Sequence, residues 1–273
     1  MIYAEEGVHI EAPEIHIGQG TTFGKGVDIK CIDGFSIGDR CRLGDDVRIR
    51  GRSVVIGDDL YHSEGLRVGG GGCDRPWASL TIGDRCTLHN QFLNLAMPIT
   101  LGNDVGLSPD VVCLTHGFWL NVLHGFPASF APIVVEDGVI VGYRSLIMMG
   151  VTIGKNAVVG AQSVVTKDLE GNAIYAGSPA KKIRDIEEPG ILEKRGLLDH
   201  ILREYREIAA YHGISPEIWA RYPIVTVNNW TCDVETLEMS GTEDEHTDSF
   251  RDHARRYGIR LYTQRPFRST LKW

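Results

Sequence analysis

Aliphatic residues recur at every sixth position through much of the first two thirds of the chain. One face of a helix recurs every 3.6 residues, so a period of six is not helical. It predicts a short strand, a tight corner and another short strand, repeated many times. The longest series is Val135, Val141, Ile147, Ile153, Val159 and Val165; shorter ones are Ile17, Phe23 and Ile29, then Ile37, Leu43 and Ile49, then Leu101, Leu107 and Cys113.

A glycine often follows the sixth-position residue, as at Gly38, Gly102 and Gly154. Glycine lets the backbone turn where a Cβ would clash. The residue two places earlier also points inward, because side chains alternate along a strand, and most of these residues are small. One medium and one small inward residue per strand are typical of a narrow triangular prism. Three cysteines fall on inward positions and are interpreted as core residues: Cys41, Cys86 and Cys113.

Two segments interrupt the repeat, residues 69–78 and residues 115–131, and are predicted as loops. The series imply about seven coils. From residue 187 the apolar residues recur at helical intervals, with Gly213 as a stop, and a strand over 223–230 and a helix over 249–257 follow. We expect a second domain of helices and strands over 187–273. It either caps the open end of the prism or takes part in acceptor binding.

Composition narrows the function. The formal charge of −8 argues against a generally basic surface for nucleic acid. No apolar run approaches the roughly 18 residues of a membrane span, and the acidic amino terminus does not look like a secretory signal. The six cysteines form no CxxC pair, which disfavours a zinc knuckle or a dithiol redox site. We expect a cytoplasmic protein that does not insert into membranes.

The repeats, together with VTIGKNAVVGAQSVVTKD (151–168) and AGSPAKKIR (176–184), resemble the hexapeptide-repeat acyltransferases. Within that family the match is to sugar acetyltransferases that act on galactosides, maltose or polysaccharides, and it covers residues 8–186. The resemblance implies a left-handed parallel β-helix, a handedness that spacing alone does not give. It also implies acetyl-CoA as the acyl donor and a homotrimer with each site between two subunits.

Acyl transfer to a hydroxyl requires a base, and a histidine titrates close to neutral pH. His116 follows Thr115 at the root of the second loop, where the resembling family places its catalytic base. The resemblance also makes Asn90 a residue that binds the acceptor, although neighbouring Asn94 could fill the same role. His124 lies eight residues into the loop and could line the acceptor pocket. No activated Ser or Cys nucleophile stands out, so direct transfer is expected.

The cofactor contacts are also implied by the resemblance. Basic side chains would meet the phosphates of coenzyme A, and backbone groups would meet its pantetheine. Tyr143 departs from the family, where serine is common, so the wall of the cofactor groove must differ. The residues carried over are Gly142, Gly160, Ala161, Lys167, Ala176, Lys181 and Arg184.

Several functions remain open from the sequence. The first is an acetyl-CoA-dependent transferase that acetylates a sugar hydroxyl of a glycan or glycan precursor. The second is an N-acetyltransferase of a nucleotide-linked amino sugar. A metal-dependent hydratase on the same fold would need three histidines around zinc, and no metal is expected here. The fourth hypothesis is a non-catalytic scaffold. It remains open because Tyr143 stands where serine is common in the family.

Overall fold

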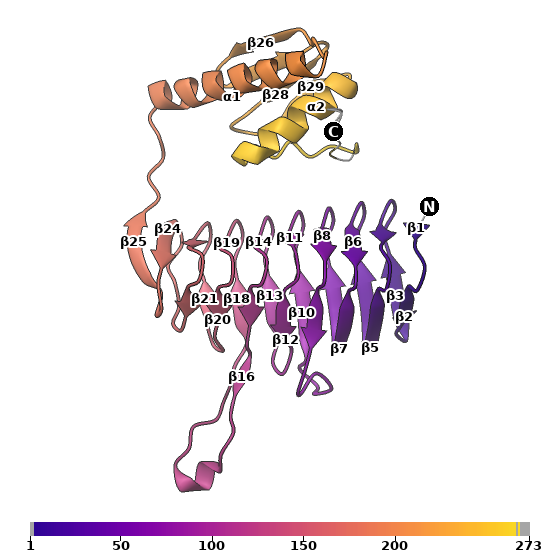
Figure 1. Ribbon diagram of the computed structural model, residues 1–273, viewed down its shortest axis with the longest axis vertical. Helices are drawn as coiled ribbons and strands as arrows, with labels where there is room; N and C mark the ends of the chain where they lie inside the picture. Colours follow the sequence, from indigo (N-terminus) through magenta and orange to yellow (C-terminus); the bar gives the residue numbers. More distant parts are fainter. Residues whose placement is uncertain (1–2, 266, 268–273) are drawn as a thin grey trace. The chain divides into compact units, whose positions relative to one another are not determined.

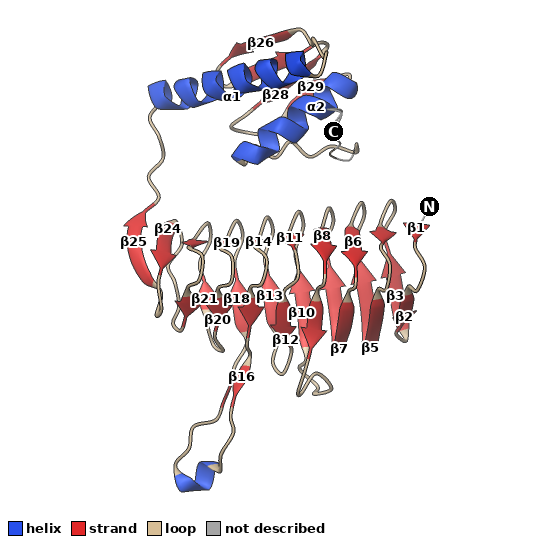
Figure 2. Ribbon diagram, in the orientation of Figure 1, coloured by secondary structure: helices blue, strands red, loops and turns tan. Residues whose placement is uncertain are grey.

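The computed structural model describes residues 3–265 and residue 267. The chain divides into two compact units, with the boundary along the chain between Ile186 and Glu187. Strands make up the first unit, apart from one short 3₁₀ helix, and both α-helices lie in the second (Figure 2). Within the described part of the chain, no helix combines the length and the apolar character needed to cross a membrane.

The first unit is a parallel β-helix whose coils stack in a row (Figure 1). Each coil contributes strands to three faces, which we call face 1, face 2 and face 3 in chain order. Face 1 consists of β1 (Tyr3–Ala4), β4 (Thr22–Phe23), β6 (Arg42–Asp45), β8 (Tyr61–Glu64), β11 (Thr87–Leu88), β14 (Gly106–Leu107), β19 (Ile140–Val141), β22 (Val158–Val159) and β24 (Ala173–Ala176).

Faces 2 and 3 form one continuous sheet, because the long strands β5 and β7 run around the corner between them. Face 2 consists of β2 (His9–Glu11), the first parts of β5 (Asp28–Ile37) and β7 (Arg48–Ile56), β9 (Arg67–Gly69), β12 (Phe92–Asn94), β15 (Val112–Cys113), β20 (Leu146–Ile147) and β23 (Val164–Val165). Face 3 consists of β3 (Glu14–Ile17), the second parts of β5 and β7, β10 (Ser79–Ile82), β13 (Ile99–Leu101), β18 (Ile133–Val135) and β21 (Thr152–Ile153).

The predicted number of coils is too low. Over the described residues, nine parallel strands stack on face 1, against about seven coils expected from the spacing. On two of these strands, the inward position that the six-residue series follows holds a residue outside the series. His62 occupies that position on β8 and Tyr175 occupies it on β24, and both side chains are buried.

The inward positions were predicted correctly. Cys41 and Cys86 are 1% exposed, Cys113 is completely buried, and all three join one continuous apolar core inside the prism. Burial raises the pKa of the Cys41 thiol to about 11 and that of Cys113 to about 12. These cysteines are core residues with no access to a substrate.

The glycine after the aliphatic residue is explained by the coil above it. A Cβ on Gly38 would lie 2.7 Å from the carbonyl carbon of Gly57, one coil further along. At the same corner the Asp58 carboxylate accepts a hydrogen bond of 2.8 Å from the Asp39 N–H. The Asp84 carboxylate accepts one of 2.9 Å from the Asp58 N–H. Stacked carboxylates thus satisfy the turning backbone.

Both predicted interruptions leave the prism at the corner between faces 2 and 3 (Figure 1). The first follows β9, and the Trp77 indole N–H anchors it by donating to the Ala96 carbonyl at 2.9 Å. The second is a hairpin formed by β16 (His116–Gly117) and β17 (Ser129–Phe130), which pair antiparallel. A 3₁₀ helix, η1 (Val122–His124), lies at its tip.

The first unit ends with β25 (Lys181–Asp185), which pairs antiparallel with β24. The second unit contains α1 (Ile191–Tyr211), a four-stranded antiparallel sheet and α2 (Glu245–Ala254), followed by η2 (Arg255–Tyr257). Leu198, Trp230 and Phe250 are among its core residues. The sheet consists of β26 (Ile218–Arg221), β27 (Ile224–Val227), β28 (Trp230–Asp233) and β29 (Met239–Gly241).

The second helix of this unit begins earlier than predicted, at Glu245 instead of residue 249. Asp244 accepts a hydrogen bond from the Thr247 N–H, and the Thr247 hydroxyl accepts one from the Asp244 N–H. This reciprocal capping box stabilises the first helical turn. Residues 268–273, the end of the predicted domain, lie outside the described residues.

Candidate functional site

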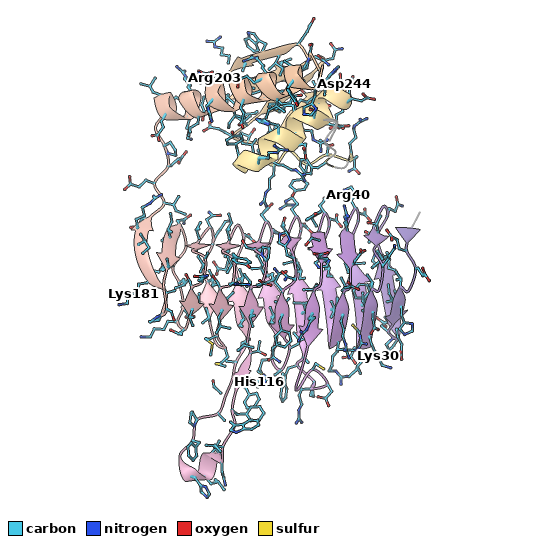
Figure 3. The ribbon with its side chains drawn as sticks, in the orientation of Figure 1. Lys30, Arg40, His116, Lys181, Arg203 and Asp244 are labelled. Atoms are coloured by element: carbon cyan, nitrogen blue, oxygen red, sulfur yellow. The ribbon has the colours of Figure 1, made fainter. Side chains whose placement is uncertain are left out.

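His116 lies at the root of the hairpin, immediately beyond β15 (Figure 3). The prism core fixes this root, because Cys113 is buried inside the coil and Thr115 is also fully buried. The His116 side chain itself is half-buried. A rigid strand end therefore carries a histidine that solvent and a substrate can still reach.

The imidazole of His116 contacts one buried amide. Its Nδ1 lies 2.6 Å from the Oδ1 atom of Asn94, at the end of β12 in the preceding coil. An amide oxygen only accepts hydrogen bonds, so Nδ1 must be the protonated nitrogen. Nε2 of the neutral ring then carries a lone pair and can accept a proton from a substrate.

Asn94 is held on every side by the protein. Its Nδ2 donates to the Gly69 carbonyl at 3.2 Å, and the Thr115 hydroxyl donates to the Asn94 carbonyl at 2.8 Å. The same hydroxyl accepts from the Met97 N–H at 3.1 Å. Asn94 is only 2% exposed. Both ends of the Asn94 amide are thus engaged inside the protein, and a direct contact of Asn94 with the acceptor stays a prediction.

Two aromatic rings frame the imidazole. The Phe130 ring stacks on His116 at 5.8 Å between centroids with an interplanar angle of 13°. The Phe118 ring lies 5.4 Å away on the same hairpin. His116 and Phe130 are opposite each other in the register of β16 and β17. These rings restrict the orientation of the imidazole and give the site an apolar wall.

The hairpin beyond His116 exposes apolar side chains along its length. Trp119 is 89% exposed and Leu123 is 88% exposed. His124 belongs to η1 at the tip, away from the root that carries His116 (Figure 2). Within one copy of the chain, the structure thus does not bring His124 to His116. Exposed apolar surface of this extent marks a surface that another molecule covers.

Asn90 lies at a different corner, between faces 1 and 2. Its amide pairs with Asp110 of the next coil, donating to the carboxylate and accepting from the Asp110 N–H at 2.9 Å. Arg144 donates to the other carboxylate oxygen at 3.2 Å, and this bond is the main cause of the lowered pKa of Asp110. Asn90 is exposed, but the hydrogen bonds of its amide connect this corner to the same corner of the next coil. Face 2 separates it from His116.

Four of the predicted cofactor residues lie at that same corner, further along the prism: Gly142, Gly160, Ala161 and Ala176. Lys167 instead follows β23 and lies at the corner between faces 2 and 3. Gly142 and Gly160 follow β19 and β22, and the exposed Ala161 stacks on Gly142. The hydroxyls of Ser145 and Ser163 both donate to the Gly160 carbonyl, at 3.0 and 2.7 Å. Ala176 continues the corner at the end of β24.

Tyr143 stands on the surface beside these residues and is 41% exposed. The Arg144 guanidinium lies 4.9 Å from the centre of its ring. The corner that the resemblance assigns to the cofactor therefore carries an aromatic ring and a cation.

Exposed cations follow at the end of the β-helix. Lys167, Lys181 and Arg184 are all exposed, and Lys181 lies on the last strand (Figure 3). Lys182 is bound to acids instead: Asp185, at 2.6 Å, is the main cause of its raised pKa, and Glu170 lies 3.5 Å away. The three exposed cations could meet phosphates. Over the described residues, no three His, Cys, Asp or Glu side chains are grouped so that they could hold a metal ion.

Comparison with protein families supports the repeat. Residues 132–167 match the family model described as the hexapeptide repeat of succinyl-transferase. A candidate acetyltransferase of Schizosaccharomyces pombe is 43% identical over 98 residues, which are 35% of this chain and 47% of that protein. A 2,3,4,5-tetrahydropyridine-2,6-dicarboxylate N-acetyltransferase of Staphylococcus aureus is 42% identical over 62 residues, 23% of this chain and 26% of that enzyme.

Among solved structures, a hexapeptide-repeat-containing acetyltransferase of Vibrio cholerae is 28% identical with a TM-score of 0.42. The match covers 48% of this chain and 73% of that chain. This chain thus spans about half the length of the first curated relative and about a quarter of the second. The predicted hexapeptide repeat is confirmed over residues 132–167, and parts of the chain are similar to proteins named as acetyltransferases.

Proposed function

We propose that the protein transfers an acetyl group from acetyl-CoA to a hydroxyl group of a sugar, with His116 as the general base. The observation that supports this most directly is the bond between His116 Nδ1 and Asn94 Oδ1, because it directs Nε2, the acceptor nitrogen of the neutral ring, away from Asn94 in a half-buried apolar frame. A base in that state removes a proton without first losing one of its own.

The acetyl group passes directly from coenzyme A to the acceptor. Nε2 of His116 takes the acceptor's hydroxyl proton while the oxygen attacks the thioester carbonyl carbon. The new C–O bond forms, the carbonyl becomes an oxyanion, and a backbone N–H stabilises it. The C–S bond then breaks, and the departing thiolate of coenzyme A takes the proton from His116. No covalent enzyme intermediate is needed, in keeping with the raised pKa values of Cys41 and Cys113.

In this proposal the pantetheine binds at the corner that carries Gly160 and Ala161, and Lys181 and Arg184 on β25 meet the phosphates. Lys167 stays a predicted phosphate contact, although it lies at the corner between faces 2 and 3. The corner of Gly160 and the corner of His116 are at opposite ends of face 2. About six extended residues cross this face, so the two corners are roughly 20 Å apart. One copy of the chain therefore does not place both around one thioester. A site formed by two copies does, with His116 from one and the corner of Gly160 and Ala161 from the other.

The exposed hairpin supports this arrangement. Trp119 and Leu123 leave large apolar surfaces in water unless a second copy covers them. We therefore include the homotrimer in the proposal. Asn90 could contribute to the acceptor pocket there, since its corner belongs to the side that would face the neighbouring hairpin.

N-acetylation is the second candidate. One curated relative that shares 42% identity over 62 residues is named as an N-acetyltransferase. The same Nε2 lone pair could deprotonate an ammonium group, so the geometry of His116 serves both acceptor types. A nucleotide-linked amino sugar is the acceptor we expect in that case.

The test is thiol release from acetyl-CoA over a panel of sugars, oligosaccharides and nucleotide-linked amino sugars. Replacing His116 by alanine should lower kcat by about 10²–10⁴-fold, with binding of coenzyme A retained. His16→Ala is the control, because this histidine is exposed on β3 of face 3, several coils before His116, and its loss should cost far less activity. Release that is independent of both the acceptor and His116 would overturn the proposal. The acceptor with the fastest thiol release shows whether the enzyme acetylates a hydroxyl group or an amine.

A further inference from the structure

We propose that the acceptor is an anionic sugar, with a carboxylate or phosphate that Arg67 and Arg48 bind on the outer side of face 2. This deepens the proposed function and rests on it. The two arginines lie side by side on neighbouring strands, because Arg48 of β7 is in register with Arg67 of β9. Both side chains are exposed.

These arginines differ from the other cations of the same strands. Arg50 pairs with Asp28, Arg52 pairs with Asp33, and Lys30 pairs with Glu11 at 3.0 Å. Over the described residues, neither Arg48 nor Arg67 makes an ion pair; Asp28, which is in register with Arg48, binds Arg50 instead. Like charges opposite each other on a sheet destabilise it, and an anion between them relieves that repulsion.

Arg67 is also held in place. Its guanidinium lies 5.1 Å from the centre of the Phe92 ring, on the next strand along the face. A cation over an aromatic face is attracted to it, and a guanidinium fixed in this way presents paired N–H groups to a carboxylate or phosphate. The contact with Phe92 thus holds the Arg67 guanidinium in one orientation even without a ligand.

The arginine pair is connected to the base. Phe92 and Asn94 are two residues apart on β12, so their side chains leave the strand on the same side. Asn94 in turn binds His116. A Cβ built on Gly70 would lie 2.9 Å from Asn94 Nδ2 and 3.4 Å from the Phe92 ring, so these groups border one surface. About 10 Å of sheet, roughly one or two sugar rings, separates Arg67 from Asn94.

The phosphates of coenzyme A have other cations available. Lys167, Lys181 and Arg184 lie at or beyond β23, whereas Arg48 and Arg67 lie on β7 and β9, on the other side of the coil that bears His116. In the proposed two-copy site these three cations come from the second copy, so Arg48 and Arg67 of the copy that supplies His116 stay available to the acceptor.

The experiment compares matched acceptors: a trisaccharide of galacturonic acid, the galactose trisaccharide with the same linkages, and galactose 6-phosphate with galactose. Binding to the full-length protein with coenzyme A is titrated calorimetrically, and thiol release gives KM for each substrate. The variants are Arg67→Gln and Arg48→Gln. Arg42→Gln is the matched control, because Arg42 is also exposed and lies 5.8 Å from the Tyr61 ring, but on face 1.

The wild type should bind the charged member of a pair more tightly, and Arg67→Gln should weaken that binding on the order of tenfold. The neutral sugars, KM for acetyl-CoA and the Arg42→Gln variant should change little. The uronate and phosphate pairs show which anion is recognised. Equal affinity for charged and neutral sugars would overturn the inference, as would a change in KM for acetyl-CoA alone. Arg67-dependent binding without any thiol release would leave the anion site standing and remove the transferase proposal.

Discussion

The imidazole of His116 and the amide of Asn94 are 22 positions apart in the chain and 2.6 Å apart in the fold. They come from consecutive coils, at the corner between faces 2 and 3. Thr115 and Met97 complete the contact, because the Thr115 hydroxyl donates to the carbonyl of Asn94 and accepts from the N–H of Met97. This buried network sets both the tautomer and the direction of the proposed base.

Asn94→Ala should lower kcat by about 10–100-fold, with little change in KM for acetyl-CoA, because the imidazole loses the acceptor that fixes its tautomer. Asn94→Asp keeps an oxygen at the same place and should recover part of the activity. Its carboxylate favours the charged imidazole, so the acidic limb of the pH–rate profile should move to higher pH. An aspartate variant as inactive as the alanine variant, with an unmoved profile, would argue for a purely structural role.

Replacing Trp119 and Leu123 together by serine should reduce assembly, since their side chains are 89% and 88% exposed within one copy. Sedimentation velocity should show a trimer for the wild type and smaller species for the double variant, with activity lost in parallel. Tyr211→Ser on α1 is the control, because Tyr211 is 86% exposed outside the hairpin. A monomeric and active wild type would refute the shared site.

Gly38→Ala should destabilise the β-helix by about 1–3 kcal/mol. The new Cβ would lie 2.7 Å from the backbone of Gly57, which cannot move without disturbing the stacked coil. Gly71→Ala is the comparison, since a Cβ there would have no neighbour within 4 Å. Urea unfolding of both variants measures the difference, and equal losses would show that stacking does not require glycine at Gly38.

His62 should make the β-helix sensitive to acid. It is completely buried, its Nδ1 accepts from the Gly44 N–H at 3.2 Å, and burial lowers its pKa from 6.5 to about 4. Between these values the unfolded chain binds a proton that the folded chain does not. Stability therefore falls as the pH drops from about 6.5 toward 4, by roughly 1.4 kcal/mol per pH unit.

The comparison is between wild type and His62→Gln, which can still accept from Gly44. From pH 7 to pH 5 the wild type should lose roughly 2 kcal/mol more of its unfolding free energy than the variant. Urea unfolding curves at the two pH values measure this directly. The same pH dependence in both proteins would mean that His62 is protonated in the fold.

The local sequence pattern was enough to predict much of the β-helix. The six-residue period, the glycine corners and the two interruptions depend on residues close in sequence, and they predicted the stacked coils and the loop roots correctly. Cys41, Cys86 and Cys113 could be placed inside because inward positions repeat regularly. The six-residue series does not extend to the inward positions of His62 and Tyr175, and the number of coils was underestimated.

The candidate site depended on stacking that no local pattern encodes. By itself the sequence determined the repeat, its loops and the position of His116 at a loop root. Only the tertiary structure showed that Asn94 is buried against that histidine, that Asn90 lies at another corner, and that Arg48, Arg67 and Phe92 align on one face. The reason is physical: contacts between coils join residues about twenty positions apart, and the register of the stacked strands decides which side chains meet.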